Sequence, residues 1–172
     1  MSRNIESKAR VEDLEPLRAR VAAIATDGPV EILQDDTFFR CDHGRLKLRA
    51  FADGSGELIF YRRPDLKGPK ESFYLRSPTA VAATLRECLS LAWGCTGRVR
   101  KRRILFHVGR TRVHLDQVGG LGPFLELEVV LAEHDSAEAG EREAAQLMAR
   151  LGIAPAQLVE GAYVDLLADS AG

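Results

Sequence analysis

The sequence predicts an α+β protein in which about eight antiparallel β-strands close into a barrel and helices pack outside it. Two observations predict this class. Polar and apolar residues alternate along most of the chain, and tight turns rather than helices join most of the alternating segments. No linker, internal repeat or low-complexity tract divides the sequence, so we expect residues 1–172 to form a single domain.

The first half of the chain is expected to hold one helix among several strands. Apolar residues recur at helical spacing over 14–24, Asp13 is a suitable N-cap, and the Asp-Gly-Pro sequence at 27–29 is the expected stop. Aspartate and glycine cluster at 42–44 and 53–56, where hairpin turns are expected. The expected strands are 4–11, 34–41, 45–49, 57–63 and 71–76.

The second half alternates between hairpins and helices. Ser77 and Pro78 are expected to open a helix as its N-cap and first-turn proline, and Gly94 to close it. Trp93 and Phe106 are expected in the hydrophobic core. The expected elements after that helix are strands at 99–108, 111–118 and 124–131, a charged helix at 136–151 and a short helical end at 155–167.

Charge is distributed unevenly, although the net charge is only −1. Residues 40–110 hold 16 Lys and Arg against 6 Asp and Glu, whereas residues 111–172 hold 3 against 11. A basic middle and an acidic end suit a site that binds an anion and a metal cation side by side. The small net charge and the 6% aromatic content argue against a nucleic-acid partner.

The sequence gives no sign of export or of membrane insertion. No stretch approaches the ~20 apolar residues of a membrane span, and the amino end lacks the apolar core of a signal peptide. Cys41, Cys88 and Cys95 lack metal-ligand spacing and are expected to be reduced thiols. We therefore expect a cytoplasmic protein with no membrane partner.

Several expected strands carry charges on one face and apolar residues on the other. Arg45, Lys47 and Arg49 alternate with leucines, as do Glu126 and Glu128. Over residues 99–103 both faces of the expected strand are basic, so the sequence does not decide which face points inward. Such strands form either a sheet with one solvated face, or a wet barrel whose charges point inward. Inward charges need partners, and a polyphosphate with Mg²⁺ or Mn²⁺ would supply them.

Distinctive segments follow one another along nearly the whole chain: NIESKARV at 4–11, DDTFF at 35–39, GRLKLR at 44–49, ELIFYRRPD at 57–65, GPKESFY at 68–74, VRKRRILF at 99–106, HLDQV at 114–118, LGPFLELE at 121–128, LGI at 151–153 and GAYVDLL at 161–167. In these segments and their order the chain resembles the CYTH superfamily of triphosphate tunnel metalloenzymes, and most closely its class IV adenylyl cyclase-like branch. The resemblance implies an eight-stranded antiparallel tunnel with helices outside and chemistry on triphosphates.

The resemblance also implies roles for particular residues. Lys8 is implied to support catalysis, and Asp116 to serve as a further metal ligand or general base. Asn4 stands where the family's amino-terminal signature has its first glutamate. The implied metal ligands are Glu6, Asp116, Glu126 and Glu128. The implied substrate-binding residues are Lys8, Arg10, Arg45, Lys47, Arg49, Arg63, Lys70, Lys101 and Arg103, with Lys70 in a loop that closes over the substrate.

Two reactions fit this set of residues. A class IV adenylyl cyclase converts ATP to cyclic AMP and pyrophosphate, and we expect that reaction first. A triphosphatase would instead hydrolyse tripolyphosphate, a nucleoside triphosphate or thiamine triphosphate, and a non-catalytic nucleotide or polyphosphate binder is a third alternative that Asn4 raises. The expected partner is ATP or tripolyphosphate, and relatives of this kind are often homodimers.

Other motifs are not expected to form functional sites of their own. His43, His107, His114 and His134 are too scattered for a zinc site, although His114 is a candidate to line the tunnel beside Asp116. The glycines at 119–122 indicate a hairpin turn rather than a phosphate loop, because no helix follows them. Asp35 and Asp36 are either a metal pair or a solvated turn, and the sequence favours the turn.

Overall fold

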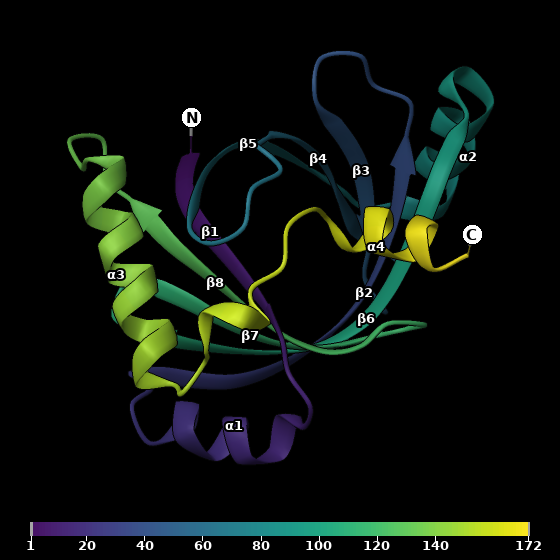
Figure 1. The fold of residues 1–172 in the computed structure, drawn as a ribbon. Helices are drawn as coiled ribbons and strands as arrows, with labels where there is room; N and C mark the ends of the chain where they lie inside the picture. The colour runs from purple at the N-terminus through teal and green to yellow at the C-terminus, as the bar shows by residue number, and fades with distance from the viewer. Residues whose placement is uncertain (1, 172) are drawn as a thin grey trace.

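The computed structural model describes residues 2–171, and its eight β-strands close into an antiparallel ring with helices around it (Figure 1). This confirms the expected fold class. The elements are β1 (Ser2–Arg10), α1 (Leu14–Ala22), β2 (Asp27–Phe39), β3 (Arg45–Ala50), β4 (Gly56–Arg62), β5 (Lys70–Thr79), α2 (Ala82–Trp93), β6 (Cys95–Val108), β7 (Thr111–Val118), β8 (Gly122–Leu131), α3 (Ala137–Arg150), a 3₁₀ turn η1 (Pro155–Gln157) and α4 (Tyr163–Ser170).

The ring runs in the order β1-β5-β4-β3-β2-β6-β7-β8, and β8 pairs with β1 to close it. Each strand from β2 to β5 forms a hairpin with the next one, and so does each strand from β6 to β8. The chain crosses between these two groups through α2, which follows β5 and leads into β6. The two longest strands, β2 and β6, pair along most of their length and join the two halves of the ring.

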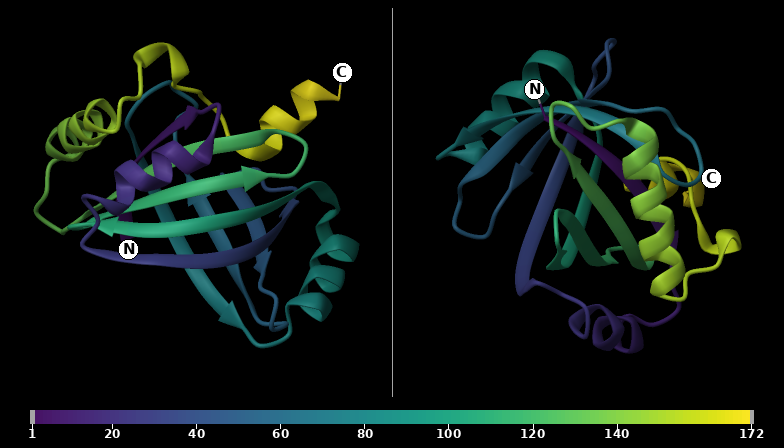
Figure 2. Two further views of the ribbon diagram at one scale, coloured as in Figure 1. Left: turned by 90° about the horizontal axis from the view of Figure 1, so that it is seen from below. Right: turned by 90° about the vertical axis from the view of Figure 1, so that its left-hand side faces the viewer.

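Most of the hydrophobic core lies outside the ring, between the strands and the helices, although one cluster that includes Phe38, Ile59 and Tyr61 lies on the inner face. Leu115 of β7 and Leu127 of β8 pack in one cluster with Leu17 of α1 and Leu147 of α3. On the other side, Leu48 of β3 packs with Leu89 of α2. Figure 2 shows α1, α2 and α3 against the outer surface of the ring. Since the apolar faces point outward to the helices, the alternate residues of the same strands point into the ring.

Several expected boundaries were wrong: β6 begins at Cys95 rather than Val99, the helical end divides into η1 and α4, and two further errors lie at prolines. Ser77 and Pro78 lie at the end of β5, where Pro78 pairs with Glu57, and α2 begins only at Ala82. The Asp-Gly-Pro sequence at 27–29 begins β2 rather than ending a helix, and the register shifts there between Asp27 and Val30. Proline is tolerated at strand ends and bulges because no ladder hydrogen bond is lost there.

The structure confirms two expectations about single residues, Gly94 and Phe106, and contradicts a third, Trp93. Gly94 ends α2 with a φ of +79°, which a residue without a Cβ adopts readily, and Phe106 is buried. Trp93 was wrongly assigned to the core, because it lies at the last turn of α2 and is 52% exposed. Over residues 2–171, no helix has the length and apolarity needed to cross a membrane.

Candidate active site

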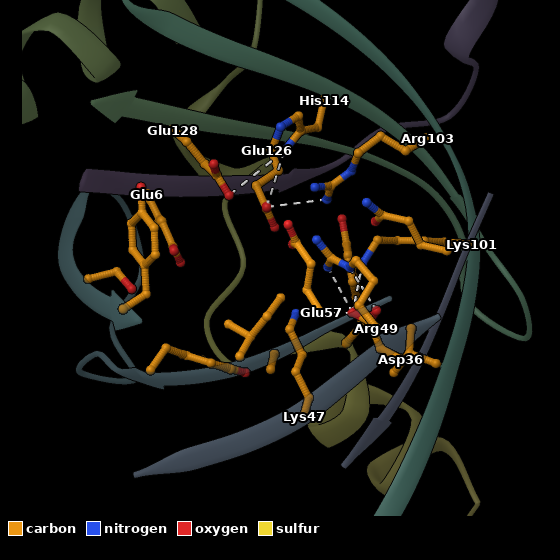
Figure 3. Close-up of a pocket in the computed structure, with 18 of the residues that line it drawn as sticks. Glu6, Asp36, Lys47, Arg49, Glu57, Lys101, Arg103, His114, Glu126 and Glu128 are labelled. Atoms are coloured by element: carbon orange, nitrogen blue, oxygen red, sulfur yellow. Dashed lines mark hydrogen bonds and ion pairs between the residues drawn. The ribbon is translucent and has the colours of Figure 1, made fainter. Parts of the chain in front are cut away.

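The ring encloses a cavity of about 280 Å³ whose wall is densely charged (Figure 3). Eight basic and five acidic side chains line it, which leaves a surplus of three positive charges for an anionic ligand. The basic residues are Lys8, Lys47, Arg49, Arg63, Arg76, Lys101, Arg103 and Arg112, and the acidic ones are Glu6, Asp36, Glu57, Glu126 and Glu128.

One carboxylate organises the basic part of the cavity. Asp36 of β2 is 1% exposed, and its oxygens accept hydrogen bonds from Arg49 Nε and Nη2 at 2.8 Å each. Lys47 Nζ donates to Asp36 at 3.0 Å and Lys101 Nζ at 3.4 Å. Asp36 and Arg49 are direct cross-strand partners, while Lys101 belongs to β6 on the other side of β2. Three basic side chains therefore converge on one carboxylate.

Burial and charge together set the pKa values of this cluster. Burial alone would raise the pKa of Asp36, but Arg49, Lys101 and Lys47 hold it well below its ordinary value. Burial lowers the pKa of Lys101 to about 7, against the opposing effect of Asp36, and Arg103 and Arg49 lower it further. Burial lowers the pKa of Lys47 as well. An incoming phosphate chain would favour the charged form of both lysines.

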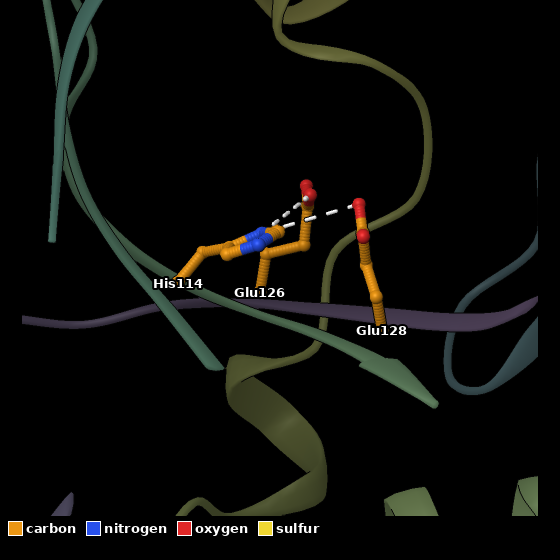
Figure 4. Close-up of side chains that lie close together, drawn as sticks. All are labelled: His114, Glu126 and Glu128. Carbon is orange, nitrogen blue, oxygen red and sulfur yellow. Dashed lines mark hydrogen bonds and ion pairs between the residues drawn. The ribbon is translucent and has the colours of Figure 1, made fainter. Parts of the chain in front are cut away.

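A second cluster, on β7 and β8, joins an imidazole to two carboxylates (Figure 4). His114 and Glu126 are direct cross-strand partners, and Glu128 is two residues further along the same face of β8. His114 Nδ1 lies 3.4 Å from Glu126 Oε1 and 4.0 Å from Glu128 Oε1. One ligand atom from each of the three residues lies within 4.8 Å of the others, which is a suitable arrangement for a divalent cation.

Positive groups surround this carboxylate-imidazole cluster. Arg103 Nη2 lies 3.3 Å from Glu126, and Lys8 Nζ lies 3.6 Å from it. Arg112 Nε lies 3.1 Å from Glu128. Burial raises the pKa of Glu126, but the hydrogen bond with His114 and the charges of Arg103 and Lys8 outweigh it and hold that pKa well below its ordinary value. Glu126 is therefore an anion at neutral pH.

The segment that leads into α4 reaches back to the cavity. The carbonyl of Gly161 accepts hydrogen bonds from Lys8 Nζ at 3.2 Å and from Arg63 Nη2 at 3.1 Å. Lys8 Nζ also lies 4.0 Å from the centre of the Tyr163 ring. Burial lowers the pKa of Lys8 to about 8, although Glu126 raises it. Lys8 is thus an amine that changes protonation close to physiological pH.

The sequence model of the CYTH domain matches residues 2–163. The chain belongs to the CYTH domain family. It is 25% identical over 177 residues to the adenylate cyclase CyaB of Aeromonas hydrophila, covering 96% of this chain and 89% of that protein. The PH1012 protein of Pyrococcus horikoshii OT3 superposes with a TM-score of 0.84 at 22% identity, over 95% of this chain and 99% of that one.

A further solved structure similar to this CYTH domain is HpAC1 from Hippeastrum, a candidate adenylyl cyclase described with a dominant triphosphatase activity. Its TM-score is 0.68 at 16% identity, and the match covers 97% of this chain and 96% of that one. At this level of identity the likeness to both solved structures concerns the fold alone. The resemblance read from the sequence motifs is confirmed at the level of the family.

Most of the residues that sequence reasoning selected line the cavity of this CYTH domain. Four do not, and Asp116 is the most consequential. It is fully buried behind Arg103, which donates to both of its oxygens at 2.7 and 2.6 Å, and the Tyr163 hydroxyl donates to it at 2.8 Å. Those on the cavity wall are Glu6, Lys8, Lys47, Arg49, Arg63, Lys101, Arg103, Glu126 and Glu128.

The three other selected residues outside the cavity wall hold neighbouring segments. Arg10 is exposed, and its Nη1 donates to the Leu121 carbonyl at 3.1 Å. Arg45 forms a two-pronged ion pair with Asp165 of α4 at 2.9 and 2.7 Å. Lys70 is the first residue of β5 rather than part of a loop, and its Nζ donates to the Leu66 carbonyl at 2.7 Å.

Sequence reasoning missed several functional candidates. Asp36 was assigned to a solvated turn, yet it is buried at the centre of the basic cluster. His114 does line the cavity, as its place beside Asp116 on an alternating strand predicts, and Tyr163 lines it too although no sequence pattern points to it. Asn4 lines the cavity, and its Oδ1 has no hydrogen-bond partner among the described residues.

Proposed function

We propose that this CYTH domain is a metal-dependent enzyme that converts ATP to cyclic AMP and pyrophosphate, as class IV adenylyl cyclases do. The observation that carries the proposal is the adjacency, in one cavity, of the basic cluster around Asp36 and the cluster of His114, Glu126 and Glu128. The match to the CyaB cyclase over 96% of the chain supports this choice of reaction.

The basic cluster is suited to the phosphate chain. Arg49 offers a planar fork that matches phosphate oxygens, and Lys47 and Lys101 offer compact charges beside it. Because Asp36 already holds all three, they do not have to be collected from flexible positions when the substrate binds. Preorganised positive charge of this kind stabilises the negative charge that shifts onto the leaving pyrophosphate.

Glu126, Glu128 and His114 would hold the divalent cation, Mg²⁺ or Mn²⁺. Their donor atoms converge and both carboxylates face the cavity, where a cation would compete with Arg103 at 3.3 Å and Lys8 at 3.6 Å from Glu126 and with Arg112 at 3.1 Å from Glu128. A bound cation would neutralise charge on the phosphoryl oxygens as a Lewis acid. Glu6 is occupied by Arg63 at 2.7 Å, so it is a less accessible ligand than the other two glutamates.

Apolar residues at one end of the cavity are suited to a nucleoside. Ile32, Phe51 and Leu105 line it there, next to Gln34, whose buried Oε1 has no hydrogen-bond partner among the described residues. Ile32, Gln34 and Asp36 are alternate residues of β2, and alternate residues of a strand lie about 7 Å apart. Gln34 is therefore about 7 Å from Asp36 along the strand, and Ile32 is about twice as far. A base could lie on the apolar surface while the amide recognises its edge.

Lys8 is the proposed catalytic group. In the cyclase reaction a neutral Lys8 amine takes the proton of the ribose 3′-hydroxyl, the oxygen bonds to the α-phosphorus, and the bond to the β-phosphate oxygen breaks as pyrophosphate leaves. A pKa of about 8 suits a general base at physiological pH. Asp116 acts through Arg103, which it orients toward Glu126, and is therefore a positioning residue.

A triphosphatase is the second candidate, in which water attacks the terminal phosphorus instead. Two observations favour it. The cavity of about 280 Å³ is close to the lower limit of about 300 Å³ for small-molecule sites, which suits a bare phosphate chain. HpAC1, which shares the fold, is described with a dominant triphosphatase activity.

The deciding experiment is incubation with ATP, tripolyphosphate or thiamine triphosphate in the presence of Mg²⁺ or Mn²⁺. Cyclic AMP with an equal amount of pyrophosphate from ATP would support the cyclase. Orthophosphate release without cyclic AMP would replace it with the triphosphatase. Tight binding with no turnover of any substrate would refute the enzyme and leave a binding protein, as the loss of a carboxylate at Asn4 would suggest.

Lys101 provides a pH test of the basic cluster. Its pKa of about 7 in the free protein rises when an anion binds, so binding takes up a proton above pH 7 and affinity for tripolyphosphate falls as the pH rises. The arginine of Lys101→Arg keeps its charge from pH 6 to 9. In this variant the fall of log affinity with pH is expected to be less steep, by up to about one log unit per pH unit. Calorimetric titration from pH 6 to 9 in EDTA, with wild type as the reference, measures this difference. Equal slopes for the two proteins would show that Lys101 does not take up a proton when tripolyphosphate binds.

A further inference from the structure

The carboxylate-imidazole cluster contains a nitrogen donor among oxygen donors. His114 is 4% exposed, and it faces the cavity because its neighbours Val113 and Leu115 are buried in the outer core. The register with β8 fixes which residues it meets, since His114 pairs directly with Glu126. The imidazole is therefore held in place by packing and strand pairing, rather than by chance contact on a mobile loop.

The spacing of the three donors fits a small divalent ion. His114 Nδ1 lies 3.4 Å and 4.0 Å from the nearest oxygens of Glu126 and Glu128. Neighbouring ligands of an ion bound at 2.0–2.2 Å lie about 3 Å apart, whereas one donor atom from each of the three residues lies within 4.8 Å of the others, so the side chains would have to close in by up to about 2 Å to share one ion. Both glutamates project from the same face of β8 into the cavity, so their carboxylates lie on the same side as the imidazole.

The chemical identity of the donors affects which ion is preferred. Mg²⁺ is a hard cation that takes oxygen ligands and retains several waters, so an imidazole adds little to its binding. First-row transition ions accept imidazole nitrogen more readily than Mg²⁺ does, and Mn²⁺ lies at the weak end of that series, so an imidazole gives Mn²⁺ a modest advantage over Mg²⁺. A site of two carboxylates alone would discriminate poorly between Mg²⁺ and Mn²⁺.

We propose that His114 is a metal ligand through Nδ1 and that it makes this site select Mn²⁺ over Mg²⁺. The inference rests on the proposed function, because it takes a divalent cation at Glu126 and Glu128 as its starting point. The competing explanation is that His114 only hydrogen-bonds to Glu126 and orients it. The two differ in one respect: a ligand contacts the ion directly, whereas an orienting residue does not.

The test uses the whole chain and metal alone, without nucleotide. Electron paramagnetic resonance titration gives the dissociation constant for Mn²⁺, and competition against Mn²⁺ gives that for Mg²⁺. Electron spin echo modulation detects the coupling of bound Mn²⁺ to a directly coordinated ¹⁴N nucleus. The proteins are wild type, His114→Gln and His134→Gln, a matched control because His134 is exposed in the loop after β8.

Wild type is expected to bind Mn²⁺ about tenfold more tightly than Mg²⁺ and to show the nitrogen coupling. His114→Gln is expected to lose the coupling and about tenfold in Mn²⁺ affinity, with Mg²⁺ affinity changed by less than about threefold, while His134→Gln behaves as wild type. The nitrogen coupling in wild type tests the proposal even if the His114 variant fails to fold.

Two outcomes would overturn the inference, and they are distinguishable. Mn²⁺ bound to wild type without nitrogen coupling, and equally well by His114→Gln, would leave the two glutamates as the metal site and remove His114 from it. The proposed function would then stand. Failure of wild type to bind either ion at millimolar concentration would remove the metal site altogether, and with it the metal-dependent reaction.

Discussion

Asp36→Asn is expected to lower the free energy of unfolding by about 3–5 kcal/mol, because it removes the only counter-ion that Lys47, Arg49 and Lys101 share among the described residues. Arg49 and Lys47 would lose their buried counter-ion and Lys101, whose pKa is about 7 even beside Asp36, would lose its proton, while an asparagine side chain offers them one neutral acceptor. Urea unfolding of the metal-free, anion-free protein measures the change. Tripolyphosphate is expected to restore part of the lost stability, since it supplies negative charge to the same groups.

Asp35→Asn is the matched control, since Asp35 is the adjacent residue on the opposite face of β2. It also meets three arginines, with Arg98 at 2.6 Å, but its side chain is 28% exposed and that of Arg98 is 43% exposed. Solvent screens such pairs, so its replacement is expected to cost about 1 kcal/mol or less. Similar losses for the two variants would contradict the central role of Asp36.

The same carboxylate predicts how stability depends on acidity. The pKa of Asp36 is depressed in the folded protein, so its contribution is fully present above its unfolded pKa of about 4 and is lost as the pH falls through the folded value. The stability difference between wild type and Asp36→Asn should therefore narrow as the pH is lowered below about 4. A constant difference from pH 7 to pH 2 would show that the loss has another cause.

Glu126→Gln and Glu128→Gln are each expected to lower metal-dependent turnover by about 10³-fold, because each removes an anionic ligand and the several kcal/mol of charge stabilisation that the bound ion supplies. The substitution preserves side-chain volume. Steady-state rates with saturating Mn²⁺, together with Mn²⁺ binding, measure the effect. Glu133→Gln is the control, since Glu133 is exposed just after β8 and should leave the rate unchanged.

Because Glu126 also faces Lys8 and Arg103, its loss leaves two buried cations less well compensated. Circular dichroism and thermal unfolding should therefore accompany the rates, so that a defect in folding is not taken for a defect in catalysis. An unaffected rate in both folded variants would exclude this cluster as the metal site.

Much of the ring could be predicted because alternation is a local property. The leucines on either side of Lys47 and Glu126 indicated strands with one apolar face, and the presence of helices indicated what would cover that face. The ambiguous strand at 99–103 needed the structure, because both faces are basic. There Lys101 and Arg103 point inward, while Arg100 and Arg102 are exposed.

Partners across the ring could not be predicted, because they depend on strand order rather than on local sequence. Asp36 looked like part of a solvated turn, since the residues that hold it are 11, 13 and 65 positions away. The family resemblance implies Asp116 as a metal ligand or general base, but Arg103 lies opposite it on β6 and donates to both of its oxygens. Neither fact is visible until the strands are paired.

The division of each strand into an inner and an outer set of residues has a consequence for how this chain can change. In β8, Glu126 and Glu128 serve the cavity, while Leu125, Leu127 and Val129 serve the packing against helices. Inserting or deleting one residue within the strand would exchange these sets, placing two carboxylates among leucines and the leucines in a wet interior. Substitutions at inner positions, by contrast, leave the outer packing intact. The inner residues of a strand can therefore be substituted one at a time, whereas a change of one residue in strand length is not tolerated. Insertions and deletions are expected in the turns.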